Sequence, residues 1–260
     1  MNISIIGTGN VATVFAKLAY RHKYNIIQVI GRNETEGAAL AKTVFASFTN
    51  LQGEIKNVDL IIIAVSDNAL PILVDELTLP QTIIVHTAGS VSINIFKDKL
   101  ENYGVFYPLQ SLRKSMEEIP TIPILIEANN ETAFAKIESF AKTISPIVKS
   151  ITEKERLSLH IAAVFANNFT NYIYAETYQF CEAEKLDFNL LMPLIKETAN
   201  RIDGKSPLEM QTGPAKRSDN ETMVKHLQVL DNYKSMSNLY QILSNGIKEL
   251  FSQKGFENKM

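Results

Sequence analysis

The 260-residue sequence has no tryptophan and only one cysteine, Cys181. A single cysteine excludes an intramolecular disulfide and a zinc site built from several thiolates, so we interpret Cys181 as a partly buried core thiol. The four histidines are scattered along the chain without the short spacing of metal ligands. The sequence therefore predicts no metal site.

The chain also lacks an excess of basic charge and any long apolar run. Its net charge is −2 and its isoelectric point is near 6.1, which argues against nucleic acid as a main partner. No stretch reaches the length of a transmembrane helix, and Met1 leads directly into a strand without a charged and apolar leader. We expect a cytoplasmic protein of two domains with no membrane partner.

The most informative segment is residues 2–18, NISIIGTGNVATVFAKL, in which an apolar strand runs into two glycines and then into a helix. Gly7 permits a tight turn, Gly9 lets the backbone approach a pyrophosphate, and Ala12 allows close packing of helix on strand. The unpaired N–H groups and the dipole of the helix favour an anion. The alternative is a strand-turn-helix that binds nothing. We expect a dinucleotide to contact Gly7, Thr8, Gly9, Asn10 and Val11.

The next predicted strand, Asn25–Ile30, ends in Gly31-Arg32-Asn33 and so indicates which dinucleotide binds. Sites that prefer NAD usually carry an acid here for the ribose 2′-hydroxyl, whereas a neutral residue followed by arginine suits a 2′-phosphate. We therefore expect NADP(H) as the cofactor, with Arg32 on its 2′-phosphate. In the alternative, Arg32 is a solvated turn residue and Glu34 or Glu36 bends inward.

Strand and helix patterns then alternate as in a doubly wound sheet. Strands are predicted at residues 44–45, 58–65, 82–85, 105–107, 122–126 and 147–148, and helices at 37–43, 69–77 and 131–144. The Rossmann unit is expected to cover residues 1–150. The predicted fold class is an α/β Rossmann domain followed by an all-α C-terminal domain.

Beyond Thr152 the apolar period changes to that of helices, which predicts an all-helical domain over residues 151–260. Its long helices are expected at 153–183, 188–202, 220–234 and 235–253. Pro193 predicts a kink or a late helix start, and Ser206-Pro207 a one-turn helix. Asp187 and Asp219 are predicted N-caps.

Small polar residues follow two of the predicted Rossmann strands. Val65-Ser66-Asp67 ends one strand, and His86 to Ser90 (HTAGS) ends another. Because the carboxyl ends of parallel strands line the ligand crevice, we expect Val65, Ser66, Asp67 and His86 to contact the cofactor and Ser90 the substrate. In the alternative, His86 is a structural histidine satisfied by loop backbone.

Five motifs together carry a family resemblance. They are HTAGS from His86, YPLQSL from Tyr107, LHIAAVFANNF from Leu159, MPLI from Met192, and TGPAKRSD from Thr212 followed by His226-Leu. In this order they resemble the Rossmann-like proteins with a C-terminal domain of unknown function 2520, a branch of the 6-phosphogluconate dehydrogenase-like superfamily, over nearly the whole chain. The resemblance implies an NADP-type oxidoreductase with a helical dimerising domain. It implies no particular substrate.

The chain departs from its relatives outside the cofactor half, at positions that bear on the substrate contacts and on the general acid. Tyr107 stands where the family usually has histidine, and Ser218 where it usually has glycine. The wider superfamily of β-hydroxyacid and ketopantoate-type reductases uses a lysine one turn before an asparagine, and here that pair is Ala163 and Asn167.

His160 is the expected replacement for the missing lysine. On a regular α-helix His160, Asn167, Asn171 and Tyr174 share one face, so we predict His160 and Asn167 as the catalytic residues. The alternative is a structural hydrogen-bond network or a set of polar pairs in a dimer interface.

The loop at residues 212–219 combines a Gly-Pro turn with two basic side chains. We expect Arg217, and His226 two turns into the following helix, to contact the substrate. A solvated basic loop is the alternative.

These features predict an NADP(H)-dependent oxidoreductase that moves hydride to or from a small carbonyl, hydroxy acid or imine. The missing lysine mildly favours an imine, since an iminium arrives already protonated. The alternative from another class is an NADP(H)-binding sensor or scaffold without turnover. The apolar helices of the second domain also predict a symmetric homodimer.

Overall fold

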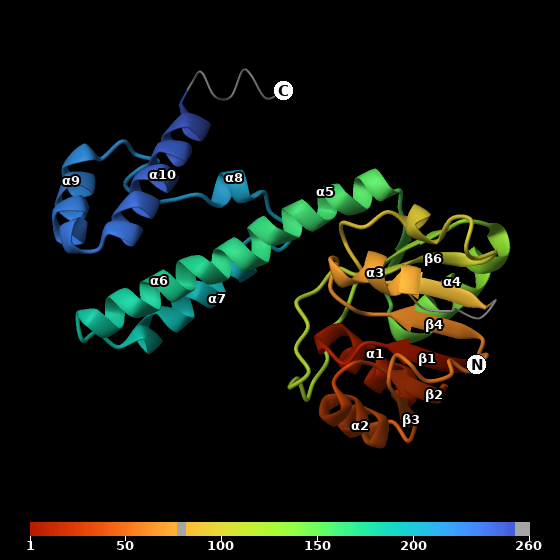
Figure 1. Ribbon diagram of the computed structural model, residues 1–260. Coiled ribbons are helices and arrows are strands. Elements are labelled where there is room, and N and C mark those ends of the chain that lie inside the picture. Colours follow the sequence, from red (N-terminus) through yellow and green to blue (C-terminus); the bar gives the residue numbers. More distant parts are fainter. Residues whose placement is uncertain (77–81, 253–260) are drawn as a thin grey trace. The chain divides into compact units, whose positions relative to one another are not determined.

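The computed structural model describes residues 1–76 and 82–252. The chain forms two compact units, Met1–Asn167 and Asn168–Met260. The first unit holds one eight-stranded sheet, and the elements of the second are helices (Figure 1). The predicted fold class, a Rossmann domain followed by an all-α region, is confirmed.

The sheet has the strand order β3-β2-β1-β4-β5-β6-β7-β8. Its strands are β1 (Asn2–Ile6), β2 (Asn25–Ile30), β3 (Ser47–Thr49), β4 (Leu60–Ile63), β5 (Ile83–His86), β6 (Tyr103–Pro108), β7 (Ile124–Ala128) and β8 (Val148–Ser150). Strands β1 to β6 are parallel, whereas β7 pairs antiparallel with β6 and parallel with β8. The order 3-2-1-4-5-6 is that of dinucleotide-binding sheets, whose ligands bind at the carboxyl ends where the winding reverses, here between β1 and β4.

Helices cover both faces of the sheet. One core contains side chains from α1 (Asn10–Arg21), α2 (Glu34–Thr43) and α4 (Glu131–Ile144), and the other from α3 (Ala69–Glu76) and the 3-10 helix η1 (Ile93–Phe96). The strands supply both cores, because Ile3 and Ile5 of β1 face the first and Ile6 faces the second. Burial on both faces is why the strands are continuously apolar.

Most predicted boundaries lie close to the observed ones, and β2 and α4 match their predictions. The strand predicted at residues 44–45 is wrong. Val44 ends α2, and Phe45 has a left-handed backbone with φ of 55°, which interrupts an extended chain. The strand begins at Ser47, which pairs with Gln28 of β2. The predicted end of the α3 helix, Leu77, lies outside the described residues.

The helical segment predicted at residues 153–183 begins and ends where predicted, but it is not a regular α-helix throughout. It consists of α5 (Glu153–Ala163), the π-helix η2 (Val164–Phe169) and α6 (Thr170–Ala183). A capping box between Thr152 and Glu155 fixes its start, as both side chains satisfy backbone N–H groups. A π turn takes one more residue than an α turn, so His160 and Asn167 lose the one-face alignment expected for a regular α-helix.

The second unit contains the remaining helices. They are η3 (Phe188–Leu191), α7 (Met192–Asn200), α8 (Pro207–Met210), α9 (Asn220–Val229), η4 (Leu230–Asn232) and α10 (Lys234–Phe251). Pro193 lies in the first turn of α7, which confirms the predicted late start, and Asp187 and Asp219 cap η3 and α9 as predicted. The predicted helix end at Gln253 lies outside the described residues. No helix in the described ranges is long and apolar enough to cross a membrane.

Candidate functional site

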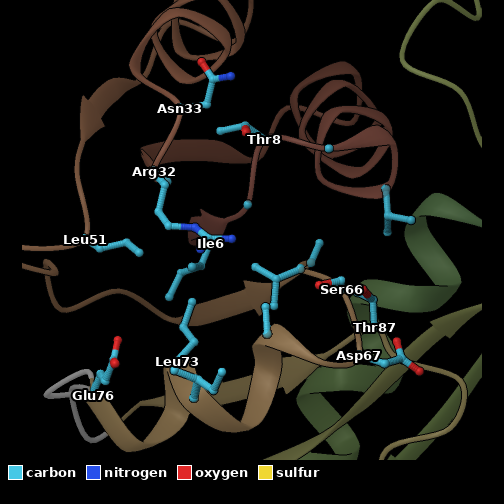
Figure 2. Close-up of a pocket in the computed structure, with 18 of the residues that line it drawn as sticks. Ile6, Thr8, Arg32, Asn33, Leu51, Ser66, Asp67, Leu73, Glu76 and Thr87 are labelled. Atoms are coloured by element: carbon cyan, nitrogen blue, oxygen red, sulfur yellow. The ribbon is translucent and has the colours of Figure 1, made fainter.

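A cavity of about 1460 Å³ lies at the carboxyl ends of the parallel strands in the first unit (Figure 2). The loop after β1 contributes Gly7, Thr8, Gly9, Asn10 and Val11, and the segment after β4 contributes Ala64, Val65, Ser66 and Asp67. These loops flank the point where the winding of the sheet reverses. The volume exceeds that of a drug-sized pocket, so the cavity has room for a dinucleotide and a small second ligand.

The glycines after β1 shape the cavity in different ways. Gly7 has φ of 130°, and a Cβ there would lie 2.2 Å from the carbonyl oxygen of Ala64. Gly9 is the N-cap residue of α1, and a Cβ there would meet no atom within 4 Å. The first turn of α1 carries no acidic side chain. The helix start is therefore open to an anion such as a pyrophosphate.

The end of β2 supplies a cation to the same cavity. Gly31, Arg32 and Asn33 line it, and the guanidinium of Arg32 extends toward Ile6 (Figure 2). Neither Glu34 nor Glu36 belongs to the lining, which consists of described residues only. Glu36 instead forms an ion pair with Lys114, 2.7 Å between Oε2 and Nζ. This arrangement suits a 2′-phosphate better than a ribose 2′-hydroxyl.

A tyrosine and a histidine meet at another part of the cavity wall. Tyr107, near the end of β6, and His160, on α5, are hydrogen-bonded with 2.9 Å between Oη and Nδ1. Their rings meet edge to face at an angle of 72°. Gly89 packs against both, since a Cβ there would lie 2.7 Å from Nδ1 of His160. Because Gly89 has no side chain, Tyr107 and His160 can approach the loop after β5 closely.

The environment keeps the Tyr107 hydroxyl protonated. Burial raises the pKa of Tyr107, the negative charge of Asp67 raises it further, and the positive charge of Arg156 partly opposes both. A protonated phenol can donate a hydrogen bond, and an imidazole next to it can accept or donate one. The pair can therefore deliver a proton to a ligand in the cavity.

His86, predicted to contact the cofactor, lies beneath the cavity surface. Its side chain is fully buried and is not part of the lining. Burial, reinforced by the charge of Arg156, lowers the pKa of His86 to about 3, so the ring is neutral at physiological pH. Its Nδ1 accepts a hydrogen bond from the N–H of Ala88 at 3.2 Å. Burial and the bond to Ala88 agree with the structural histidine that the sequence left as the alternative, although its Nε2 atom is buried without a hydrogen-bond partner among the described residues.

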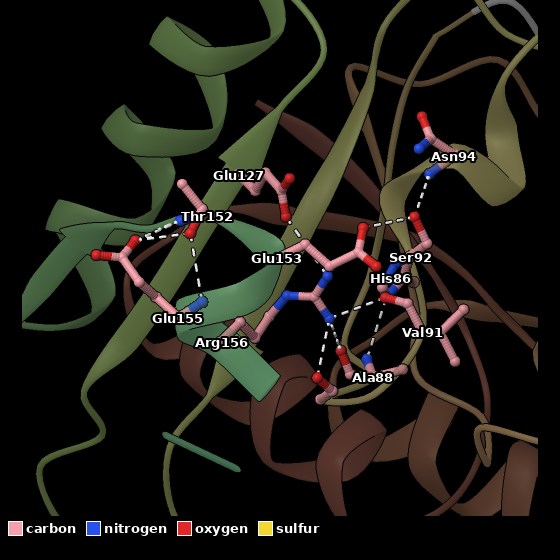
Figure 3. A network of polar contacts seen from close by, with 11 residues as sticks. His86, Ala88, Val91, Ser92, Asn94, Glu127, Thr152, Glu153, Glu155 and Arg156 are labelled. Carbon is pink, nitrogen blue, oxygen red and sulfur yellow. Dashed lines mark hydrogen bonds and ion pairs between the residues drawn. The ribbon is translucent and has the colours of Figure 1, made fainter. Parts of the chain in front are cut away.

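A buried arginine holds the loop after β5 in place (Figure 3). The Nη1 atom of Arg156 donates to the carbonyl oxygens of Ala88 (3.0 Å), Gly89 (3.0 Å) and Val91 (2.8 Å). Its Nη2 lies 3.4 Å from a carboxylate oxygen of Glu127. With 1% of its surface exposed, Arg156 has protein partners for Nη1 and Nη2, whereas its buried Nε has none among the described residues. Its hydrogen bonds fasten this loop to α5.

The other predicted site residues are spread over both units. The hydroxyl of Ser90 donates a hydrogen bond to the carboxylate of Asp67 at the cavity wall. Asn167 lies in η2 and is not part of the cavity lining. Arg217 and His226 belong to the second unit, where Nδ1 of His226 lies 2.9 Å from the hydroxyl of Tyr240. Their substrate contacts stay predictions.

Two family models match the chain. Residues 2–89 match the family "NADP oxidoreductase coenzyme F420-dependent", and residues 122–247 match "Domain of unknown function (DUF2520)". A comparison with curated proteins finds no match.

Solved structures resemble the chain over nearly its whole length. A protein from Bacteroides fragilis that is assigned as an NADP oxidoreductase is 37% identical, with a TM-score of 0.88 over 95% of this chain and 98% of that one. A Thermotoga maritima protein is 21% identical (TM-score 0.70; 96% and 98% covered). An imine reductase from Myxococcus stipitatus in complex with NADP⁺ is 14% identical (TM-score 0.65; 100% and 95% covered). The last two show the fold alone.

Proposed function

We infer the function from the family to which the chain belongs, the Rossmann-type NADP oxidoreductases with a C-terminal domain of unknown function 2520. We propose that the chain catalyses hydride transfer to or from a small carbonyl, hydroxy acid or imine. The observation that carries this proposal is one continuous cavity. It joins a glycine loop and an arginine suited to NADP(H) to a tyrosine–histidine pair suited to proton transfer. Hydride chemistry needs both parts.

The roles of the residues follow from what hydride transfer requires. Bound NADPH supplies a hydride to an electrophilic carbon. The start of α1 would hold the pyrophosphate, and Arg32 the 2′-phosphate. His160, hydrogen-bonded to Tyr107, would deliver a proton to the atom that gains electrons and stabilise the charge that develops there.

The direct test is cofactor binding followed by a substrate panel. We expect the purified protein to bind NADPH and to oxidise it when a carbonyl or imine substrate from the panel is present. The panel should contain aldehydes, ketones, 2-oxo acids and cyclic imines. Tight NADPH binding with no oxidation by any compound, together with no effect of mutating His160, would favour a sensor or scaffold instead.

Cofactor preference provides a separate prediction. Arg32→Ala should reduce the preference for NADPH over NADH by about tenfold or more, because a charge-assisted hydrogen bond to the 2′-phosphate is lost. Calorimetric affinities of native and mutant protein for both cofactors measure this. Lys42→Ala, which removes a cation from α2 outside the cavity, is the matched control. Equal affinities of the native protein for NADPH and NADH would contradict the assignment of Arg32.

The helical unit is proposed to form a homodimer. Among its described residues, the buried apolar side chains are limited to Cys181, Ala215, Met223 and Leu230. Large apolar side chains remain exposed along its helices and the turns between them: Phe169, Tyr172, Ile173, Tyr178, Leu186, Leu190, Met192, Leu194, Ile202, Leu208, Val224, Val229, Ile242 and Leu243. A unit with so small a core and so much exposed apolar surface is suited to association with a second copy.

Light scattering should therefore give about twice the chain mass of 29.1 kDa. Ile242→Glu places a charge at a side chain that is 67% exposed on α10 and should shift the protein toward monomer. Gln241→Glu, at the neighbouring exposed position, adds the same charge outside the apolar set and should leave the mass unchanged. A native protein that stays monomeric at micromolar concentration would reject the dimer.

A further inference from the structure

The cavity wall near the Tyr107–His160 pair carries a fixed negative charge, that of Asp67. Asp67 lies beside Ser66 and Thr87 in Figure 2, on the side of the cavity away from Glu76 and Leu51. The described lining includes two other carboxylates, Glu54 and Glu76, and one arginine, Arg32. Figure 2 places Arg32 and Glu76 away from Asp67.

The structure holds this carboxylate in position. Asp67 lies in the loop between β4 and α3, and the hydroxyl of Ser90 donates a hydrogen bond to its Oδ2 atom. Gly89, the neighbour of Ser90 in the chain, packs against both rings of the Tyr107–His160 pair, so the loop that holds Asp67 also contacts this pair. The negative charge of Asp67 accordingly adds to burial in raising the pKa of Tyr107. The carboxylate therefore lies close enough to act on a group that receives a proton from the pair.

The positive charge that opposes Asp67 at Tyr107 is that of Arg156, which is buried on protein groups and not available to a ligand. Arg156 is 1% exposed, donates to three backbone carbonyls and pairs with Glu127. His160, at the same wall, is hydrogen-bonded to Tyr107. Arg32, the arginine among the described lining residues, lies on another side of the cavity, and this lining includes no lysine. No lysine or arginine of the described lining therefore opposes the half-buried carboxylate of Asp67 at this wall.

We propose that the reacting group of the substrate is a cation, an iminium formed from an imine in the cavity, and that the carboxylate of Asp67 stabilises it. This inference rests on the proposed function and names its substrate class. A negative wall favours a cation and disfavours the anionic group of a 2-oxo acid.

The chemistry balances with the Tyr107–His160 pair as the proton donor and NADPH, the cofactor of the proposed function, as the hydride donor. The Tyr107–His160 pair gives a proton to the imine nitrogen, which forms an N–H bond and makes the C=N group cationic. Addition of a hydride then forms a C–H bond, and the π pair of C=N returns to nitrogen as a lone pair. The product is a neutral amine, and the proton given up by the pair is replaced from solvent.

Binding tests the charge preference without requiring turnover. Calorimetry on the full chain with NADP⁺ should show pyrrolidinium, the cationic form of a cyclic amine, binding about tenfold or more tightly than neutral cyclopentanol. Asp67→Asn, which keeps size but removes the charge, should weaken pyrrolidinium binding by about tenfold while leaving NADP⁺ and cyclopentanol affinities within about twofold. Ser90→Ala keeps the charge and should retain most of the pyrrolidinium affinity. Glu118→Gln, at an exposed carboxylate outside the cavity, is the control for net charge.

Several results would overturn the inference. One is that the native protein binds pyrrolidinium no more tightly than cyclopentanol, or does not bind pyrrolidinium measurably. Another is an Asp67→Asn protein that loses NADP⁺ affinity as much as pyrrolidinium affinity, which would make Asp67 a cofactor ligand.

Turnover separates this inference from the proposed function. Suppose that the native protein oxidises NADPH with 2-methyl-1-pyrroline but not with cyclopentanone, and that Asp67→Asn slows this reaction. This result supports both the inference and the proposed function. Turnover of cyclopentanone or a 2-oxo acid in preference to the imine keeps the proposed function and overturns the iminium. Asp67-dependent binding of pyrrolidinium without any turnover supports the cation site and overturns the proposed function.

Discussion

Replacing His160 by alanine is expected to lower kcat by about 10²-fold or more while the affinity for NADPH stays nearly unchanged. The reason is the position of the imidazole. It lines the cavity, is hydrogen-bonded to Tyr107 and is held by Gly89, away from the glycine loop and Arg32. Loss of a positioned proton donor affects the chemical step, whereas cofactor binding depends on other groups.

Single-turnover kinetics and NADPH titrations measure these effects. Ser158→Ala, an exposed residue on the same helix, is the control and should have the native rate. Tyr107→Phe removes the hydroxyl bonded to Nδ1 and should also lower kcat, by about tenfold or more. A native kcat in His160→Ala would contradict its role. The predicted role of Asn167, which lies in η2, is tested by Asn167→Ala in the same assay.

Gly7→Ala is expected to destabilise the protein by about 3 kcal/mol or more, because two costs add. Gly7 has φ of 130°, a backbone conformation that alanine rarely adopts. The new Cβ would also lie 2.2 Å from the carbonyl oxygen of Ala64, so β1 or β4 must move. Chemical denaturation of native and mutant protein gives the difference in free energy of unfolding.

Gly9→Ala is the matched variant and should act differently. A Cβ at Gly9 meets no atom within 4 Å, so the free energy of unfolding should change by less than about 1 kcal/mol. Gly9 lines the cavity at the start of α1, where a methyl group would occupy the space needed by a pyrophosphate. We expect about tenfold or greater loss of NADPH affinity. A Gly9→Ala protein with native affinity would contradict the placement of the pyrophosphate.

Local patterns in the sequence were sufficient for most of the secondary structure. The strand at β2 and the helix α4 have their predicted bounds, and the caps at Asp187 and Asp219 were predicted from their side chains. These features depend on neighbours a few residues apart, through apolar period and side-chain hydrogen bonds to nearby N–H groups. The glycine loop belongs to this group, since its strand, turn and helix are contiguous.

The same local reasoning failed where the backbone leaves a regular path. The strand predicted at 44–45 is replaced by a left-handed residue, Phe45, and the predicted helix at 153–183 contains a π turn. Neither feature has a strong composition signal. The left-handed residue interrupts the extended chain, whereas the π turn changes which side chains share a face, because it takes one residue more than an α turn.

The sequence by itself determined a Rossmann sheet, a helical second region and an NADP(H)-type loop, since each is encoded by contiguous residues. Tertiary structure alone decided the pairing of Tyr107 with His160, 53 residues away, and of Asp67 with Ser90, 23 residues away. It also decided that Arg156, one turn before His160 on α5, is buried and donates hydrogen bonds to three backbone carbonyls, and is not solvated. Such contacts depend on strand order and on how α5 meets the sheet, which no local period records.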